Sequence, residues 1–412
     1  MYSFSGKIKL VAIISMVVGL LGIGYSFIAT PSTVEALGAH ASHDPAHAEH
    51  VLHLLQNKPW AALYVAALFF MLISLGVLAF YAINRAAQAG WAPILFRVME
   101  GITGYLPIGA LIFFLLLVFS GLHFNHLFIW MDPSVVAHDK VIQGKTGYLN
   151  VPFFLVRAAI YMLGWIAYRQ ITRKLSKAQD QAHDNRPFIK AFKWSAGFLV
   201  FFLVSESMMS WDWVMSVDPH WFSTLFGWYV FGSLITSAIA AIILVTVTLK
   251  AQGYLQQVND SHLHDLAKYL FGFSIFWTYL WFSQYLLYWY SNIPEEVTYF
   301  VTRLEHYEPI VLSMLAINFL LPLLILVDSD IKRKPWVVGT MAVVILVGHY
   351  LDFFNMIMPA TVGDQWCIGA GEIGSVLFFF GLFTFVTFHS LTKAPLVEKN
   401  HPLMHESEHF HY

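Results

Sequence analysis

Long apolar runs, separated by short polar connections, dominate the pattern of hydrophobic and polar positions in this chain. Each run holds about twenty residues, which suffices for a helix to cross a hydrocarbon layer about 30 Å thick. We therefore predict ten membrane-spanning helices, at residues 10–29, 60–83, 101–122, 150–171, 194–216, 224–249, 266–291, 308–328, 336–357 and 370–390.

The first of these runs, at residues 10–29, follows Lys7 and Lys9 and so resembles a signal peptide. At about twenty residues it is longer than the apolar region of a typical signal peptide. We interpret it as a membrane helix that the protein retains.

Composition agrees with a lipid environment. The chain of 412 residues is 58% hydrophobic and only 12% charged, about half the charged fraction of an ordinary soluble domain. A soluble fold of this composition would expose large apolar patches and aggregate. We therefore predict an all-α polytopic membrane protein with one integral domain over residues 1–412.

The basic residues predict the orientation of the helices. If the N-terminus is cytoplasmic, eighteen of the 23 Lys and Arg residues fall in cytoplasmic connections or termini, against four on the outer side. The remaining one, Arg157, lies inside a predicted helix. This bias is the positive-inside pattern of membrane proteins. It predicts that both termini are cytoplasmic and that the number of spans is even.

Two segments are rich in histidine, and both are candidates for metal binding by spacing alone. One is a predicted loop at residues 40–53, and the other is a polar C-terminal tail at residues 394–412. No Cys or carboxylate cage accompanies these histidines, so we favour solvated segments or partner contacts and predict no metal site. The histidines are His40, His43, His47, His50 and His53 in the loop, and His401, His405, His409 and His411 in the tail.

Ionisable residues inside the predicted helices are the main candidates for function, because each costs about 2.5–3.5 kcal/mol to insert. Glu206 and Asp212 are six residues apart on one helix, so they point in different directions. If the acids converge, they could accept and release protons. The alternative is a buried ion pair between Arg157 and one acid that only fixes helix register. The candidate proton route comprises Arg157, Glu206, Asp212, His349, Asp352 and Glu372.

The strongly aromatic helix at 266–291 carries residues that could line a flat, aromatic ligand site. Trp277, Trp281, Gln284 and Tyr288 recur at helical spacing, although helix packing and an interfacial aromatic belt explain such a stripe more simply. The histidines at the end of the third helix share a face. The candidate ligand pocket comprises His123, His126, Trp281 and Gln284.

Two further cofactor patterns are weak. Only His349 lies deep enough for a haem ligand, and no second deep histidine matches it. The only cysteine, Cys367, excludes an internal disulfide and a thiolate-held iron–sulfur cluster. Residues 369–374 match GxGxxG, but no strand precedes them. Close packing of helices through small residues explains this match better.

Three stretches resemble the polysulfide-reductase-type (NrfD-like) membrane subunits of bacterial alternative complex III. They are KTGYLNVPFFLVRA at 145–158, SMMSWDWVMSVDPHW at 207–221, and HDLAKYLFGFSIFWTYLWFSQYLLYWYSNIPEE at 264–296. The ten-helix layout extends the resemblance over nearly the whole chain. The length and the second stretch are most similar to the smaller of the two paralogous subunits of this kind.

The resemblance implies a subunit of a respiratory complex that oxidises quinol and passes electrons to a cytochrome c or a terminal oxidase. The implied partners are the paralogous membrane subunit, an iron–sulfur subunit, c-type cytochrome subunits and, in some arrangements, the oxidase. The haem c and iron–sulfur clusters would belong to these partners, with no covalent cofactor on this chain. Menaquinol is a candidate ligand, which would make the candidate ligand pocket a quinone pocket. The resemblance also implies two four-helix bundles plus two peripheral helices. The bacterial inner membrane is the expected location.

Three functions are compatible with these observations. The first is a proton-conducting or quinol-binding subunit of such a complex. The second is a structural anchor for redox subunits. The third is a secondary transporter, for which matching broken helices in the two halves are a typical sign that we do not find here.

Overall fold

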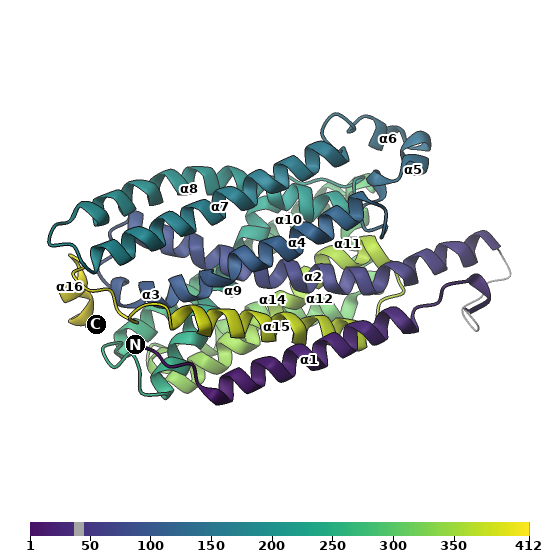
Figure 1. Ribbon diagram of the computed structural model, residues 1–412. Helices are drawn as coiled ribbons and strands as arrows, with labels where there is room; N and C mark the ends of the chain where they lie inside the picture. The colour runs from purple at the N-terminus through teal and green to yellow at the C-terminus, as the bar shows by residue number, and fades with distance from the viewer. Residues whose placement is uncertain (37–44, 412) are drawn as a thin grey trace.

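The computed structural model describes residues 1–36 and 45–411, which fold into helices and contain no strand. Nine helical segments of this part of the chain are long and apolar enough to cross a membrane. The protein is therefore an all-α, multi-pass membrane protein. Eight long helices form most of it (Figure 1): α1 (Gly6–Ala29), α2 (Pro45–Ala86), α7 (Val151–Gln179), α8 (Arg186–Trp213), α9 (Phe226–Ala251), α10 (Asp260–Ser291), α14 (Pro335–Val362) and α15 (Ala370–Leu391).

Two further spans are interrupted helices. The span predicted at 101–122 consists of α3 (Pro93–Ile102), the short η2 (Thr103–Tyr105) and α4 (Leu106–Gly121). The span predicted at 308–328 consists of α12 (Glu308–Leu315), the π-helical turn η5 (Ala316–Leu320) and α13 (Leu321–Ile325). Pro107 and Pro322 lie just after these irregular turns. Proline lacks an amide hydrogen and clashes with the preceding turn, so the regular hydrogen-bond ladder breaks there.

Helix α10 is long enough to span but is not among the nine apolar segments. Its many Trp, Tyr, Ser and Gln side chains lower its hydropathy below that of the other long helices. The short connecting helices were not predicted from the sequence. They are η3 (Ile129–Met131), α5 (Pro133–His138), α6 (Lys140–Gln143), η4 (Met215–Val217), α11 (Pro294–His306), η6 (Ile331–Arg333) and α16 (Met404–Glu408).

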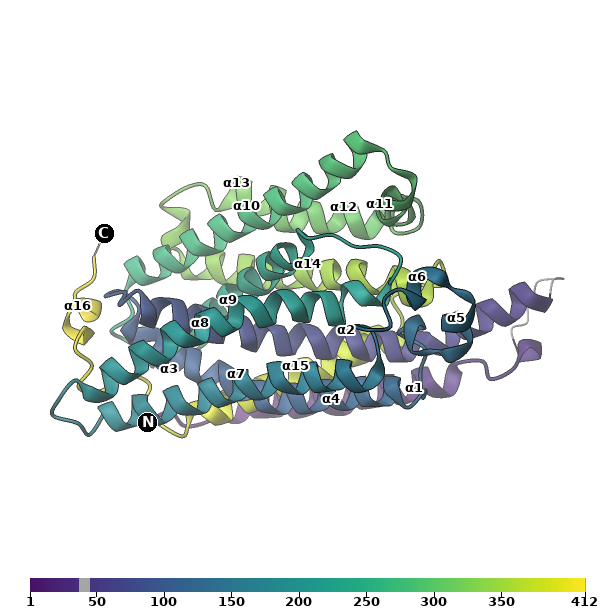
Figure 2. The same cartoon turned by 90° about the horizontal axis from the view of Figure 1, so that it is seen from above.

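Helix α2 is the centre of the fold. It packs against α4, α8, α9, α14 and α15, and 94% of its most apolar stretch is buried. Helix α7 closes a ring by packing on both α4 and α8. Helices α10 and α14 both pack on α9, and α12 packs on α14, on the other side of α2 (Figure 2).

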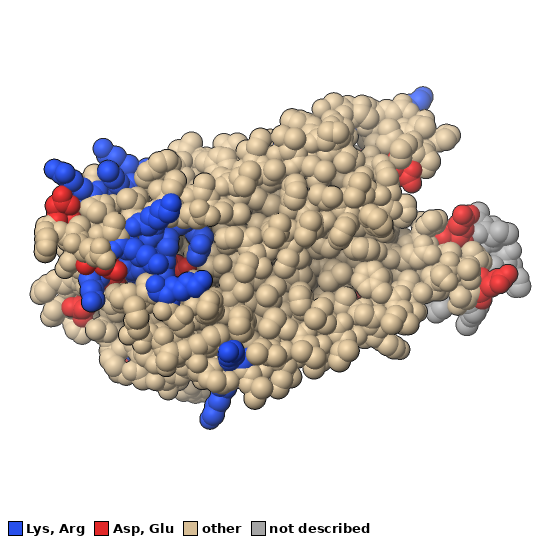
Figure 3. Space-filling model, in the orientation of Figure 1, with Lys and Arg blue, Asp and Glu red and all other residues tan. Residues whose placement is uncertain are grey.

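Both termini lie at the same end of the molecule in both views (Figures 1 and 2). Most of the Lys and Arg side chains on the visible face gather at this end (Figure 3). Helices α5, α6 and α11 lie at the opposite end. We call these the basic end and the opposite end. The arrangement agrees with an even number of crossings.

The two histidine-rich segments differ from the prediction. His40 and His43 lie outside the described residues, and His47, His50 and His53 belong to the first turns of α2, where they are exposed. The C-terminal segment docks onto the basic end. Ser407, for example, donates a hydrogen bond to the Trp91 carbonyl at 2.8 Å. The segment docks because four of its residues are buried in contacts at this end: Leu396, Glu398, His401 and Ser407.

Candidate functional site

Asp352 on α14 is the centre of a buried polar site. Its side chain is fully buried. The hydroxyls of Tyr229 and Ser233, both on α9, donate hydrogen bonds to its carboxylate. The indole N–H of Trp277 on α10 donates a third bond at 2.8 Å. Three helices therefore hold one carboxylate, and all three donors are neutral groups.

His349 lies one turn before Asp352 on α14, as the spacing of three predicts. Its Nδ1 is 3.8 Å from Asp352 Oδ2, beyond hydrogen-bond distance. Neither ring nitrogen has a hydrogen-bond partner in the described chain, although the residue is fully buried. Trp277 packs edge-on against the ring at 5.5 Å.

Arg157 on α7 and Asp212 on α8 form a different kind of site. Arg157 Nε and Nη2 each donate a 2.8 Å hydrogen bond to Asp212, one to each carboxylate oxygen. The Tyr161 hydroxyl donates a third at 3.1 Å. The guanidinium also lies 3.8 Å from the centre of the Tyr148 ring. A bidentate pair with this shell is suited to fixing α7 against α8.

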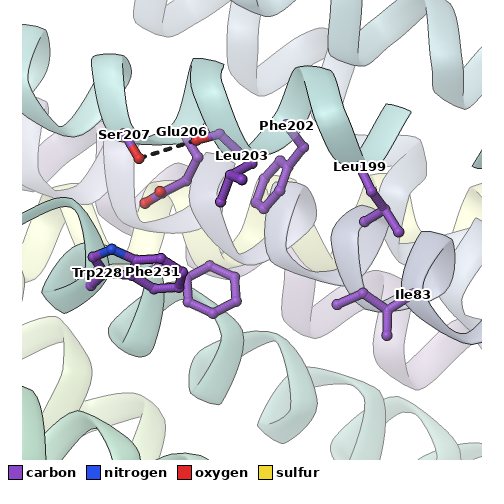
Figure 4. Close-up of a pocket in the computed structure, with 8 residues that line it drawn as sticks. All are labelled: Ile83, Leu199, Phe202, Leu203, Glu206, Ser207, Trp228 and Phe231. Carbon is purple, nitrogen blue, oxygen red and sulfur yellow. Dashed lines mark hydrogen bonds between the residues drawn. The ribbon is translucent and has the colours of Figure 1, made fainter. Parts of the chain in front are cut away.

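Glu206 on α8 faces away from this ion pair, as predicted from its six-residue separation from Asp212. It lines a pocket of about 200 Å³ between α8 and α9 (Figure 4). The side chain is only 3% exposed, and its Oε1 has no hydrogen-bond partner in the described chain. The other lining residues are nearly all apolar: Ile83, Leu199, Phe202, Leu203, Ser207, Trp228 and Phe231.

Helix α9 lies between Glu206 and Asp352. Its residues Trp228 and Phe231 line the Glu206 pocket, whereas Tyr229 and Ser233 bind Asp352. These four residues span only five helical steps, about 7.5 Å along the axis. Both acids therefore lie at a similar depth, on opposite sides of one helix.

Glu372 is separate from both sites. Its Oε2 accepts a 2.9 Å hydrogen bond from the Gly369 amide, so it caps the start of α15. Its Oε1 is buried without a partner in the described chain. The six residues of the predicted proton route thus do not form one connected cluster. Hydrogen bonds and close contacts join Arg157 to Asp212 and bring His349 near Asp352, while Glu206 and Glu372 stand apart.

The four residues of the predicted quinone pocket also lie apart. His123 and His126 are exposed beyond the end of α4, and α4 packs on α2 and α7 rather than on α10. Trp281 on α10 lines a separate apolar pocket with α12 and η5, and Gln284 does not line it. The shared face expected for His123 and His126 is not formed, because α4 ends at Gly121 and His123 has a φ of +62°. Helical spacing therefore does not apply to these two positions. It carried no information about which helices are neighbours.

Sequence reasoning missed several partners of the buried charges. Tyr229 and Ser233 look like ordinary helix residues, and Trp277 was interpreted as packing. Arg303, assigned to an outer loop, is buried on α11 and donates to the Asn355 carbonyl at 3.0 Å. That carbonyl lies four residues before Pro359, which has no amide to bind it. In the sequence, Pro359 inside a long apolar helix is the signal that a carbonyl one turn earlier needs another donor, such as Arg303.

A charged network at the basic end was also missed. Glu100 on α3 pairs with Arg97 and Arg173, and lies 4.0 Å from Arg85. Arg85 also pairs with Glu398 of the docked C-terminal segment. The sequence places these arginines in connections, where solvation is the simple expectation. The structure buries them because acids from distant segments neutralise them.

No protein-family model matches the chain. No curated protein matches it either. Function is therefore proposed from the buried polar geometry together with the resemblance of the three stretches.

Proposed function

We propose that this chain is a membrane subunit of a quinol-oxidising respiratory complex of the alternative complex III type. Its buried acids would move protons while partner subunits carry the electrons. The observation that supports this most is the pair of buried acids, Glu206 and Asp352, on opposite sides of α9, neither bound to an Arg or Lys.

The charge of the partners decides which acids suit proton transfer. A carboxylate held by a guanidinium keeps its charge, because protonation would leave a buried cation unpaired. A buried carboxyl with only neutral partners gains little from ionising in a medium of low dielectric constant. Such a group can exist with or without its proton, which is the requirement for a relay. Glu206 and Asp352 have no cationic partner among the described residues, so we propose them as the relay groups and Asp212 as a structural contact.

The proposed topology has ten spans, with α10 included and both termini in the cytoplasm. Its two four-helix bundles would be α2, α3–α4, α7 and α8, and then α9, α10, α12–α13 and α14. Helices α1 and α15 would be peripheral. The contacts among these helices and the clustering of Lys and Arg at the end that holds both termini support this arrangement.

The proposed setting is the bacterial inner membrane, beside a paralogous membrane subunit, an iron–sulfur subunit, c-type cytochromes and, in some complexes, a terminal oxidase. Haem c and iron–sulfur clusters would reside in those partners. Menaquinol or a similar quinol would supply the protons. The membrane, the partner subunits, their cofactors and the quinol are all proposed from the sequence resemblance.

The test is isosteric replacement of the two acids in the intact complex. We expect Glu206→Gln and Asp352→Asn each to lower proton release and quinol turnover at least about tenfold, because neither amide can exchange the proton. Turnover and proton release would be measured on the complex reconstituted in liposomes. Glu308→Gln is the matched control, since Glu308 is exposed at the start of α12.

The outcomes separate the alternatives. Normal assembly with unchanged turnover and proton release in both acid variants would contradict the relay and favour a structural anchor. Purification of the chain without haem c or iron–sulfur partners would contradict the respiratory assignment and favour a transporter.

A further inference from the structure

A hollow of about 420 Å³ opens near the basic end between α4, α7 and α15. It is separate from the buried acids of the proposed proton route. Three basic residues of α7 and one just beyond α15 line it. The full lining is Gly104, Ile108, Arg169, Arg173, Lys177, Phe385, Val386, His389, Ser390 and Lys393.

The positive charge of this hollow is mostly uncompensated. Arg173 pairs with Glu100. In the described part of the chain, no ion pair joins Arg169, Lys177 or Lys393 to a carboxylate, and the buried Nε of Arg169 has no hydrogen-bond partner. Three cations are therefore gathered around one hollow without an internal counter-ion. Such a concentration of like charge favours a bound anion.

Close packing at Gly104 brings polar groups together at the floor of the hollow. A Cβ at this position would lie 2.6 Å from Ser390 Oγ and 3.5 Å from Arg169 Nη2. Only a glycine lets the α3–α4 break approach both groups this closely. The floor thus presents a hydroxyl and a guanidinium to the same space, a combination that suits phosphoryl oxygens.

The wall of the hollow changes from charged to apolar along the helices. The charged residues lie toward the basic end: Arg173 and Lys177 on α7, and Lys393 just beyond α15. Ile108, Phe385 and Val386 lie on the side of the membrane centre, and all three are at least partly exposed. An anion that fills the hollow therefore meets cations on one side and an apolar surface on the other.

We infer that this hollow binds the phosphodiester headgroup of an anionic phospholipid in the leaflet at the basic end, with acyl chains along Ile108 and Phe385. Basic pockets between membrane helices recognise such headgroups. Free phosphate shares the phosphoryl chemistry. It would gain nothing from the apolar wall, which is why the lipid is the favoured source.

The test measures lipid retention by the purified full-length chain in detergent, using native mass spectrometry with added phosphatidylglycerol or phosphatidylcholine. Lys177 and Lys393 are exposed and have no ion pair in the described chain, so Lys177→Gln/Lys393→Gln preserves the fold. We expect this variant to bind phosphatidylglycerol about 25-fold more weakly, at about fivefold per lost charge. Phosphatidylcholine should bind weakly to both proteins.

The matched control is Lys174→Gln/Lys190→Gln, which removes two exposed lysines of α7 and α8 that do not line the hollow. It should bind phosphatidylglycerol like the unchanged protein. Three results would overturn the inference: equal affinity for the two lipids, equal weakening by the control pair, or saturable binding of inorganic phosphate without retention of phosphatidylglycerol.

Discussion

Asp212 and Asp352 are both fully buried aspartates, but their partners differ in charge. Asp212 meets a guanidinium, and Asp352 meets hydroxyls and an indole. A buried ion pair holds two helices in register but contributes little net stability over an apolar pair of the same size. The same residue type therefore forms an ion pair in one place and has only neutral partners in the other, and the proposed relay rests on this difference.

The ion pair gives a stability prediction. Asp212→Leu leaves the Arg157 guanidinium buried and unpaired, so it should lower the free energy of unfolding by about 3–5 kcal/mol. The double variant Arg157→Met/Asp212→Leu should recover most of this loss, because both charges are then absent. Denaturant unfolding of the purified protein in detergent measures each change.

The comparison with Asp352 provides the control. Asp352→Leu removes an acid without leaving a cation behind, so its destabilisation should be smaller than that of Asp212→Leu. A double variant at 157 and 212 that is as unstable as the single one would show that the lost hydrogen bonds to Tyr161 and the Tyr148 carbonyl dominate instead.

The sequence identified the charged residues buried inside the long apolar runs, namely Arg157, Glu206, Asp212, His349 and Asp352, but not the buried network at the basic end or Arg303. It could not identify their partners. The contact of Tyr229 with Asp352 joins positions 123 residues apart, and only helix packing brings them together. Helix periodicity predicts which face of one helix a residue occupies, but not which helices are neighbours. The residues expected to form a single cluster therefore lie at separate sites.

At the scale of elements, the packing of α1 on α15 depends on glycines. A Cβ on Gly374 would lie 2.9 Å from the Gly22 carbonyl carbon, and one on Gly19 would lie 2.4 Å from the Phe378 amide. The interpretation of residues 369–374 as a small-residue packing motif is therefore confirmed. Backbone contact of this kind is common between membrane helices, where close van der Waals contact replaces the hydrophobic effect.

Enlarging this contact should separate the two helices. Gly374→Leu places a side chain against the backbone of α1, so α1 must shift, at a cost of about 1–3 kcal/mol or more. Hydrogen exchange of residues 6–29 should rise. Gly24→Leu on α1 is the control, because its Cβ would have no neighbour within 4 Å. Equal protection of α1 in both variants would contradict a glycine-dependent contact.

Some element boundaries were predictable, whereas α7 and α8 each extend eight residues beyond the prediction toward the basic end. The ends of α9 and α15 lie within two residues of the predicted ends, because hydropathy changes sharply there. Helix α2 extends fifteen residues before the predicted start, since its first turns are polar and leave no hydropathy signal. The π-helical turn before Pro322 depends on how neighbouring helices accommodate the irregular backbone. Composition does not encode that.

At the scale of the whole molecule, the docked C-terminal segment joins the basic ends of several helices. His262 on α10 contacts the Ser407 carbonyl at 3.0 Å. His401 packs against Phe96 and Phe188. Burial lowers the pKa of His262 to about 4 and that of His401 to about 3. Burial raises the pKa of Glu398, which lies beside His401 and Arg85.

Acid should therefore release this segment. Between pH 6.5 and 4 the undocked histidines bind protons and the docked ones do not, so undocking becomes more favourable as the pH falls. At pH 5.5 each of the two histidines shifts the equilibrium between the docked and undocked segment about tenfold toward the undocked state. Proton uptake by docked Glu398 opposes part of this effect. Hydrogen exchange of residues 394–411, corrected for the intrinsic pH dependence, measures the balance.

The variant His401→Phe isolates one contribution. It keeps an aromatic ring between Phe96 and Phe188 but has no titrating group. Its segment should open less on acidification than that of the unchanged protein. A pH response identical to that of the unchanged protein would assign the effect to Glu398 and other groups.

The central position of α2 has a consequence for biosynthesis. A ribosome delivers α2 to the membrane before α8, α9, α14 and α15, the helices that later enclose it. Between residues 61 and 82 this helix carries no charged side chain. It can therefore remain in contact with lipid until the later helices insert. The helices α8 and α14, which carry the buried acids, insert when α2 is already in the membrane and can pack against it.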